Sequence, residues 1–198
     1  DSQWITNEYS RGVGHQVRHE ADAILIGSGT LHADNPSLTS RIKGKKTRDP
    51  HRVILDTRLA MKESAKVINP DSDAKTIIVT GPGIPDNRRK KFEDLGAELI
   101  EVPLSGKRLD LNQVMIKLGR MSILSVLIEG GGTVAAEALK AGIVNKVLYF
   151  IAPKFLGGND GVPVFSGAGP KRIDDAYQLD RVDVNRFEQD LLVTGYLK

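Results

Sequence analysis

The sequence predicts an α/β domain of three layers, in which helices cover both faces of a mostly parallel sheet and an antiparallel hairpin follows at the carboxyl end. Six short apolar runs are bounded by polar or turn residues, and helical patterns lie between several of them. Alternating strands and helices are typical of a parallel sheet. Near the end, residues 176–187 and 191–197 are separated by only a few polar residues, which favours an antiparallel hairpin on that sheet.

The strands are expected where apolar residues run without interruption. AILIG at 23–27 is an unbroken apolar run with polar or turn residues on both sides. This pattern is typical of a strand that is buried on both faces of a sheet. Five more segments repeat this pattern and are expected to be buried strands: 52–56, 76–80, 97–102, 123–129 and 146–152.

Four helices are expected from spacing and from capping residues. Apolar residues recur every four positions at Tyr9, Val13, Val17 and Ala21, with Thr6 or Asn7 as the cap. A second helix opens at Pro85 and Asp86 and is closed by Gly96. Asp110 with Gln113 resembles a capping box before a third helix. The fourth is expected over 133–141.

Composition narrows the class of protein. With 198 residues, 40% of them hydrophobic, the chain can bury one sizeable core, so a single domain over 1–198 is expected. The sequence has no cysteine, which excludes disulfides, thiolate nucleophiles and cysteine-ligated metal centres. A reducing, cytoplasmic setting fits this composition.

Charge and hydropathy indicate which partners to expect. The net charge is +3, and basic residues concentrate at 41–52 and 86–94. Such clusters are typical of solvated surface and, less often, bind small anions. Aromatic residues make up 5% of the chain and are not interleaved with these basic clusters, so we do not expect the protein to bind nucleic acid. No apolar run approaches the roughly 20 residues of a spanning helix, and the first residues do not resemble a signal peptide. We therefore do not expect a membrane among the partners of the protein.

Three consecutive glycines follow Glu129 at a predicted strand end and precede Thr133 at a helix start. Exposed backbone N–H groups and the positive end of a helix coincide at such a turn, which can hold a phosphate. Without Cβ atoms, the glycines would let a dinucleotide pyrophosphate approach the backbone. The alternative is that they serve only the sharp turn. The spacing is not G-x-G-x-x-G, so no Rossmann fingerprint is predicted.

A second glycine-bearing turn follows the strand at 23–27. Gly27 and Gly29 precede Thr30, and Asp34 and Arg41 follow within the same stretch. Two such turns suggest two phosphate-containing ligands or one long one. Asp34 is either a turn-stabilising carboxylate or a ligand contact. Arg41 and Arg18 are candidates to bind a terminal phosphate, because a guanidinium can donate two charge-assisted hydrogen bonds to two phosphate oxygens at once.

Other catalytic constellations are weak or missing. His15 and His19 are four residues apart, the spacing that places two imidazoles on one side of a helix for a metal, but no third ligand is evident, so no metal is expected. His32 and His51 belong to no Ser/His/Asp-like arrangement, and no G-x-S-x-G motif occurs.

Several segments in combination carry a family resemblance: SQWIT (2–6), Arg18, GSGTLHADNPSLTSR (27–41), RVILDT (52–57), LIEGGGT (127–133) and YFIAPKFLGG (149–158). Together they resemble the reductase domain of riboflavin biosynthesis, which is the carboxyl-terminal half of bacterial RibD proteins and has stand-alone archaeal and fungal relatives. The resemblance extends from Ser2 to nearly the last residue. It implies a dihydrofolate-reductase-like fold.

The resemblance implies NADPH-dependent reduction of 5-amino-6-(5-phosphoribosylamino)uracil, in which the ribosyl group becomes ribityl. By motif, the cofactor contacts are expected at Trp4, Thr30, Asp34, Thr57, Gly131, Gly132, Thr133, Val134, Ala135, Ala136 and Glu137. The phosphorylated pyrimidine is expected at Ser2, Arg18, Leu38, Arg41 and Glu129. Glu129, which would hold the pyrimidine or ribose, and Asp34, at the junction of nicotinamide and sugar, are the catalytic candidates. No protein nucleophile is needed, because the nicotinamide carries the hydride.

The resemblance also implies features beyond the sequence. Family members carry, upstream of the SQWIT element, a strand with a lysine and an S-x-D-G turn, so we expect a further strand before residue 1. Bacterial members are fused to a zinc deaminase whose H-x-E and P-C-x-x-C signatures do not occur here. The family usually assembles at least as dimers, so a homodimer is expected.

Two other functions stay open on the sequence. One is a reductase of the same fold that acts on a pterin or another nucleotide-like heterocycle, although Arg18 and Arg41 favour a phosphorylated substrate. The other is a nucleotide-binding subunit without catalysis. The sequence also leaves NADPH and NADH open, although Arg58 and the basic loop 41–48 are suited to a 2′-phosphate.

Overall fold

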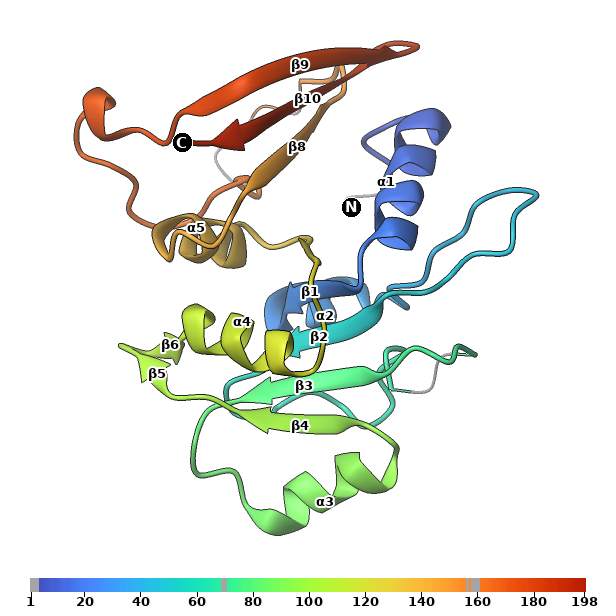
Figure 1. The fold of residues 1–198 in the computed structure, drawn as a ribbon, viewed down its shortest axis with the longest axis vertical. Helices are drawn as coiled ribbons and strands as arrows, with labels where there is room; N and C mark the ends of the chain where they lie inside the picture. The colour runs from blue at the N-terminus through green and yellow to red at the C-terminus, as the bar shows by residue number, and fades with distance from the viewer. Residues whose placement is uncertain (1–3, 69–70, 156, 158–160) are drawn as a thin grey trace.

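The computed structural model describes residues 4–68, 71–155, 157 and 161–198, and it contains two main sheets (Figure 1). Five strands form the first sheet in the order β4-β3-β2-β1-β7, and each neighbouring pair is parallel. These strands are β1 (Ala23–Gly27), β2 (His51–Leu55), β3 (Thr76–Thr80), β4 (Glu98–Glu101) and β7 (Val126–Ile128). The predicted parallel sheet is therefore confirmed.

The central strands of this sheet are buried on both faces. Every residue of β1 and of β3 is buried, as their unbroken apolar runs predict. Ile24 and Ile26 belong to one core, whereas Ala23 and Leu25 belong to a second core on the opposite face, because successive strand residues point to opposite sides. The outer strands β4 and β7 are only partly buried.

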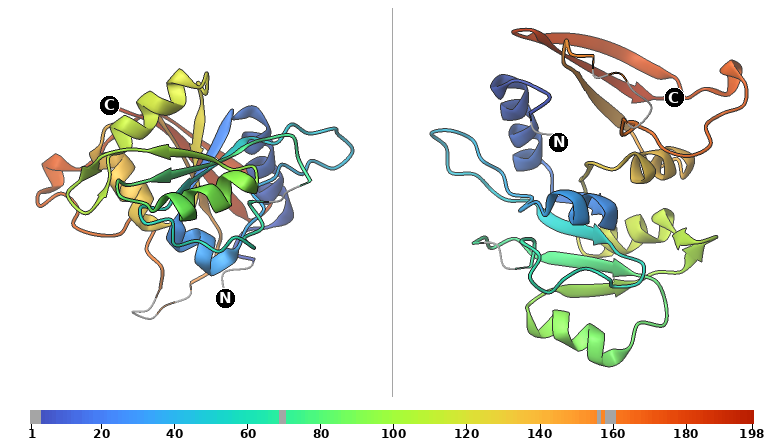
Figure 2. Two further views of the ribbon diagram at one scale, coloured as in Figure 1. Left: turned by 90° about the horizontal axis from the view of Figure 1, so that it is seen from below. Right: turned by 180° about the vertical axis from the view of Figure 1, so that it is seen from behind.

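Helices cover both faces of the parallel sheet. Leu31 of α2 (Ser28–Asp34) and Phe92 of α3 (Asp86–Asp94) complete the first core. Leu118 of α4 (Leu111–Arg120) and Ala138 of α5 (Gly132–Lys140) complete the second. The left view of Figure 2 shows α2 and α4 on opposite sides of the sheet. The three-layer prediction is confirmed, although the sequence pattern did not indicate α2.

The predicted caps lie where the sequence places them. Asn7 caps α1 (Glu8–Glu20) by accepting a hydrogen bond from the Ser10 N–H at 2.9 Å. Asp110 caps α4, because its carboxylate accepts from the backbone N–H groups of Asn112 and Gln113. Gly96 follows α3 with a φ of +84°, the left-handed conformation that commonly ends a helix.

The second main sheet is antiparallel and has the order β8-β10-β9. It contains β8 (Lys146–Ile151), β9 (Leu179–Phe187) and β10 (Asp190–Leu197). β9 and β10 form the predicted hairpin, but its expected place on the parallel sheet is wrong, because β10 pairs with β8 in a separate sheet. The expectation that 146–152 is a buried strand is wrong, since Tyr149 and Ile151 are each 40% exposed. An antiparallel sheet can leave one face uncovered, and the apolar run alone does not distinguish this case.

Polar contacts hold α1 against the hairpin of the second sheet. Asp190 accepts hydrogen bonds from the Asn7 backbone N–H and from the Ser10 hydroxyl, both at 2.7 Å. The Asn7 side chain in turn donates to the Phe187 carbonyl at 2.7 Å. Ser10 is the buried residue of this helix, whereas Tyr9 is 62% exposed. Ser10, Val13 and Val17 follow the i, i+3, i+7 spacing of one helix face, and both valines are partly buried, so the predicted apolar side of α1 is a contact face from which Tyr9 departs.

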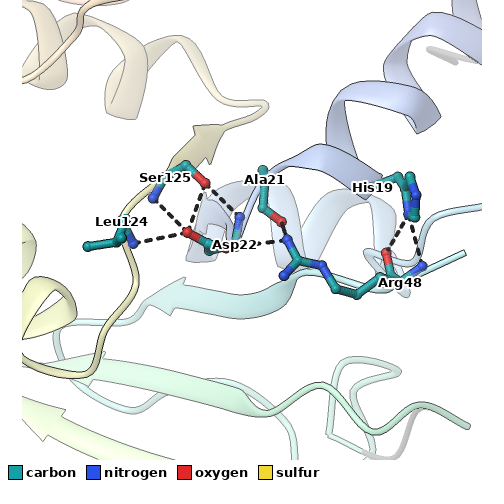
Figure 3. A network of polar contacts seen from close by, with 6 residues as sticks. All are labelled: His19, Ala21, Asp22, Arg48, Leu124 and Ser125. Carbon is teal, nitrogen blue, oxygen red and sulfur yellow. Dashed lines mark hydrogen bonds and ion pairs between the residues drawn. The ribbon is translucent and has the colours of Figure 1, made fainter.

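The other end of α1 is tied to the parallel sheet by Asp22 (Figure 3). One carboxylate oxygen accepts from the N–H groups of Leu124 and Ser125 and from the Ser125 hydroxyl, each at 3.0 Å. The other oxygen pairs with Arg48 at 3.3 Å. Because residues 124 and 125 lead into β7, this network fixes the end of α1 relative to β7.

Short elements complete the described fold: β5 (Leu104–Ser105), β6 (Arg108–Leu109) and the 3-10 helix η1 (Ile173–Asp175). β5 and β6 pair with each other. Within the described ranges, no helix combines the length and the apolar character that crossing a membrane requires.

Candidate active site

One edge of the parallel sheet brings together three of the predicted segments. Parallel strands all present their carboxyl ends on the same edge, where ligands of α/β proteins normally bind. Glu129 and the glycine turn follow β7, residues 28–30 follow β1, and Thr57 follows β2 shortly after its end. β1 lies between β7 and β2. The segments after β7 and β1 are therefore immediate neighbours.

The first two glycines of the turn are required by the protein itself. Gly130 and Gly131 have φ values of +67° and +58°, which residues with a side chain rarely adopt. Thr30 lies against them: a Cβ on Gly130 would be 2.9 Å from Thr30 Oγ1, and one on Gly131 would be 3.0 Å away. Both glycines remain exposed to solvent, so a ligand can approach their backbone.

The third glycine is covered by a distant part of the chain. Gly132 is buried, and a Cβ on it would overlap the Pro163 carbonyl oxygen and lie 2.6 Å from Ser166 Oγ. The Ser166 N–H also donates to the Gly132 carbonyl at 3.0 Å. Thr133 is exposed. The accessible backbone of the turn is thus at Gly130, Gly131 and Thr133. No local pattern in the sequence indicated that residues 163–166 cover Gly132.

The rest of the predicted cofactor segment is engaged with the protein. Val134 packs so closely on Gly27 that a Cβ there would lie 2.8 Å from its Cγ2. The carboxylate of Glu137 pairs with Arg108 and with Lys140, each at 3.2 Å. Ala135 is partly buried and Ala136 is buried. Contacts of these residues with a cofactor stay a prediction.

Arg18 and Glu129 form a two-point ion pair at the start of the turn. Arg18 Nε lies 2.8 Å from one carboxylate oxygen and Nη2 lies 2.6 Å from the other. The Arg18 side chain is 20% exposed and the Glu129 side chain 28% exposed. Arg18 Nη1 also donates to the Thr39 carbonyl at 3.2 Å. The structure thus joins α1, the end of β7 and the loop after α2 at one point.

The loop after α2 presents two of the predicted substrate residues. The Leu38 side chain lies in the first core and is 3% exposed, and its backbone has a φ of +55°. A substrate contact at Leu38 would therefore be made by its peptide groups. Arg41 is exposed, and its backbone N–H donates to His15 Nδ1 at 3.2 Å.

The sequence did not assign His15 to the site, but the structure places it there. Burial lowers the pKa of His15, and the positive charges of Arg18 and Arg41 lower it further. The negative charge of Glu129 and a hydrogen bond to the Thr39 backbone raise the pKa, but by less. His15 thus lies among the predicted substrate residues. The three-residue spacing of His15 and Arg18, which puts both on one helix face, is the signal that could have revealed this.

The remaining predicted residues lie less close to this cluster. Asp34 is exposed at the end of α2, and Thr57 packs against Gly81 after β3, whose N–H donates to the Thr57 carbonyl at 3.0 Å. Trp4 is 63% exposed, and its ring lies 4.5 Å from the Arg11 guanidinium. Ser2 is outside the described residues. The structure does not bring Trp4 to the glycine turn by any of these contacts.

Surface depressions elsewhere do not coincide with these residues. One lies on α3, lined by Asp86, Arg89 and Glu93 among others. A second, of about 410 Å³, lies near the carboxyl terminus and is lined in part by Leu139 and Tyr196. The candidate site rests instead on side chains that converge at the carboxyl edge of the parallel sheet, where ligands of α/β proteins normally bind.

Among the described residues, no group of three or more His, Asp or Glu side chains is arranged to hold a metal ion. The two histidines of α1 contact backbone groups instead. His15 Nδ1 accepts from Arg41, and His19 Nδ1 accepts from the Arg48 N–H at 2.9 Å.

Known proteins resemble this chain over nearly its whole length. The riboflavin biosynthesis protein RibD of Actinobacillus pleuropneumoniae is 35% identical over 195 residues, which cover 98% of this chain and 50% of that protein. A 2,5-diamino-6-ribosylamino-4(3H)-pyrimidinone 5′-phosphate reductase of Methanothermobacter thermautotrophicus is 31% identical over 186 residues, covering 93% of this chain and 83% of that protein.

A solved structure supports the fold. RibD of Acinetobacter baumannii superposes with a TM-score of 0.84 at 24% identity, covering 100% of this chain and 52% of that one. The chain thus spans about half the length of the RibD proteins it matches. The expected dihydrofolate-reductase-like fold is confirmed. The RibD C-terminal domain matches residues 1–193, and the chain belongs to this family.

Proposed function

We propose that the chain catalyses the reductase step of riboflavin biosynthesis, in which NADPH reduces 5-amino-6-(5-phosphoribosylamino)uracil to the ribitylamino product. The observation that carries the proposal is the pairing of Arg18 with Glu129 at an exposed glycine turn, while His15 on the same helix contacts the backbone of Arg41. Relatives named as RibD and as a pyrimidinone phosphate reductase support the reaction class.

The glycine turn fits a phosphate-bearing cofactor at two of its three glycines. Gly130 and Gly131 are exposed and have no side chain, and the first N–H groups of α5 have no acceptor within the helix. We propose that these groups and the Thr30 hydroxyl bind the pyrophosphate of NADPH, while the covered Gly132 shapes the turn. The nicotinamide would supply the hydride.

The chain's own residues would bind and orient the substrate. Arg41 would bind the terminal phosphate by charge-assisted hydrogen bonds. Glu129, held by Arg18, would face the pyrimidine or the opened sugar, and Asp34 would order the junction between nicotinamide and sugar. Hydride addition at the first sugar carbon, with one proton going to the adjacent nitrogen, converts the ring-opened ribosylamine to the ribitylamine.

The decisive experiment measures the loss of NADPH absorbance in the near ultraviolet with two substrates. One is the uracil derivative, and the other is the 2,5-diamino-pyrimidinone named for the archaeal relative. We expect turnover with the uracil derivative and slower turnover with the diamino compound. Oxidation of NADPH with a pterin but with neither phosphorylated pyrimidine would refute the proposal, and so would tight NADPH binding without consumption.

The preference for NADPH is a separate proposal. Arg58 is exposed directly after Thr57, and the loop 41–48 carries several lysines, which would suit the 2′-phosphate that distinguishes NADPH from NADH. Arg58→Gln should raise the KM for NADPH by about tenfold and leave the KM for NADH unchanged, since a lost charge contact acts only on the phosphorylated cofactor. Equal effects on both cofactors would contradict this assignment.

We also propose that the protein is cytoplasmic and forms a homodimer. In the whole protein, we propose that a zinc deaminase domain is fused upstream of this chain and that a further strand of the reductase domain precedes residue 1. Coverage of about half of RibD supports the fusion. Exposed Val182 and Val184 on β9 offer an apolar surface for the second copy. Light scattering should give twice the chain mass, and Val184→Glu should shift it to one chain mass, whereas a wild-type monomer at micromolar concentration would oppose the dimer.

A further inference from the structure

Helix α1 holds the backbone of the predicted substrate loop at two points. His15 Nδ1 accepts from the Arg41 N–H at 3.2 Å, and Arg18 Nη1 donates to the Thr39 carbonyl at 3.2 Å. His15 and Arg18 are three residues apart and therefore lie on one helix face. Arg18 also binds Glu129. The start of the loop is thus fixed relative to Glu129 through a single helix.

The contact with Arg41 defines the protonation of His15. A ring nitrogen that accepts a hydrogen bond from a backbone N–H carries no proton itself, so a neutral His15 carries its proton on Nε2. Burial and the charges of Arg18 and Arg41 lower the pKa of His15, whereas Glu129 and the Thr39 backbone raise it. The net lowering favours the neutral ring that the contact requires.

We infer that His15 is a positioning residue, which fixes the Arg41 backbone so that the Arg41 guanidinium meets the substrate phosphate with little loss of freedom. The inference rests on the proposed function, in which Arg41 binds that phosphate. A long side chain on an exposed loop must be ordered when it binds, and anchoring its backbone beforehand lowers this cost. Removing the anchor should therefore weaken binding of the phosphorylated substrate more than it slows the chemical step.

His19 offers a matched control on the same helix. Its Nδ1 accepts from the Arg48 N–H at 2.9 Å, at the far end of the same basic loop. The Arg48 guanidinium is already engaged with Asp22 and with the Ala21 carbonyl. The two histidines thus make the same kind of contact, but only His15 holds the residue expected to bind phosphate.

The test compares His15→Ala, His15→Asn and His19→Ala in steady-state kinetics. Asparagine Oδ1 is bonded to Cγ as histidine Nδ1 is, so His15→Asn retains an acceptor at that place. We expect His15→Ala to raise the KM for the phosphorylated substrate about tenfold with kcat within about threefold. His15→Asn should restore the KM, and His19→Ala should leave it near that of the wild type. With the dephosphorylated substrate, His15→Ala should match the wild type.

A second measurement is independent of turnover. Amide hydrogen exchange, followed by NMR, should show faster exchange of the Arg41 N–H in His15→Ala and protection in His15→Asn, because the hydrogen bond is what slows exchange. If His15→Ala does not fold, His15→Gln replaces it, since its oxygen lies one carbon farther out and should not restore the KM.

Several results would overturn the inference. The first is an unchanged KM for the phosphorylated substrate in His15→Ala. The second is an increase in KM that is equally large in His15→Asn or in His19→Ala. The third is an increase in KM of His15→Ala that persists with the dephosphorylated substrate. A wild-type enzyme that consumes no NADPH with either pyrimidine would instead refute the proposed function and the inference with it. An active wild type with an unaffected His15→Ala variant refutes only the inference.

Discussion

The guanidinium of Arg18 binds both carboxylate oxygens of Glu129, at 2.8 and 2.6 Å, although the two residues are 111 positions apart in the sequence. Two-point pairing fixes the plane of both groups as well as their separation. Both side chains keep some exposure, so a ligand at the glycine turn can reach them. The pair therefore orients Glu129 without sealing it from a substrate.

Replacing Glu129 tests its catalytic assignment. Glu129→Gln keeps the size of the side chain but removes its charge and one Arg18 contact, and kcat should fall on the order of 100-fold if Glu129 acts on the reacting sugar. The KM for NADPH should stay within about twofold of the wild-type value. Glu98→Gln, which breaks an exposed pair with Lys75 on β4, is the control and should leave kcat unchanged. Unchanged turnover in Glu129→Gln would exclude the role.

The Asp22 network should make stability depend on pH in the acid range. Burial raises the pKa of Asp22, but hydrogen bonds from Leu124 and Ser125 and the Arg48 contact outweigh it, so the pKa lies below its usual 3.8. A lowered pKa stabilises the folded state above the unfolded-state pKa, and this contribution is lost as the pH falls through the folded-state value.

Asp22→Asn measures that contribution. At pH 7 the variant should lose about 1–2 kcal/mol of unfolding free energy in urea titrations, a modest figure because the side chain is partly exposed and screened. The difference from wild type should shrink as the pH falls below about 4, where the wild-type carboxylate is protonated as well. Asp180→Asn, on an exposed strand, should show no such convergence. A difference that is constant down to pH 2.5 would contradict the network's role.

The cover over Gly132 can be tested by adding one methyl group. Gly132→Ala would place a Cβ against the Pro163 carbonyl and Ser166, and such overpacking should cost about 1–3 kcal/mol of unfolding free energy. Gly14→Ala, inside α1 with no atom within 4 Å of the new Cβ, should instead stabilise by about 0.5–1 kcal/mol. Equal stability of the two variants would mean that residues 163–166 do not rest on the turn.

Arg52 tests how a buried charge is tolerated in the parallel sheet. It is 1% exposed, and its guanidinium donates to the hydroxyls of Thr76 and Ser72 and to the Ala74 carbonyl. Burial lowers its pKa, while Asp49 opposes the shift. Arg52→Lys keeps the buried positive charge but lacks the planar guanidinium whose N–H groups make these hydrogen bonds. The substitution should lower the free energy of unfolding by about 3 kcal/mol.

Arg52→Met removes the charge along with the hydrogen bonds. It should cost less than Arg52→Lys in thermal and urea unfolding, because an apolar side chain of similar length has no desolvation penalty. If methionine proves the more damaging substitution, the three hydrogen bonds outweigh the burial of the charge at this position.

Elements with a local signal were predictable. The unbroken apolar runs of β1 and β3 identify buried strands, and Asn7 and Asp110 identify helix starts by side-chain chemistry alone. Helix α2 was missed because GSGTLHADN has two glycines and no run of apolar residues at helical spacing. Its Leu31 is buried against the sheet, so packing rather than propensity stabilises that helix.

The candidate site was predictable only in part. Family motifs pointed to Glu129, Arg18 and Arg41, whereas nothing local indicated that His15 holds Arg41 or that Pro163 covers Gly132. Ser10 and Asp190, which join α1 to the second sheet, are 180 residues apart. Contacts of this kind depend on how elements pack, and the residue types that make them are common on any surface.

The sequence by itself determined the parallel sheet, the order of most of its elements and the family, because apolar period, capping chemistry and motif spacing are properties of neighbouring residues. The tertiary structure alone decided that β8 belongs to a second sheet, that Arg18 is paired with Glu129, and that a histidine of α1 holds the Arg41 loop. Those outcomes depend on which surfaces exclude water together, and that is settled only when distant segments meet.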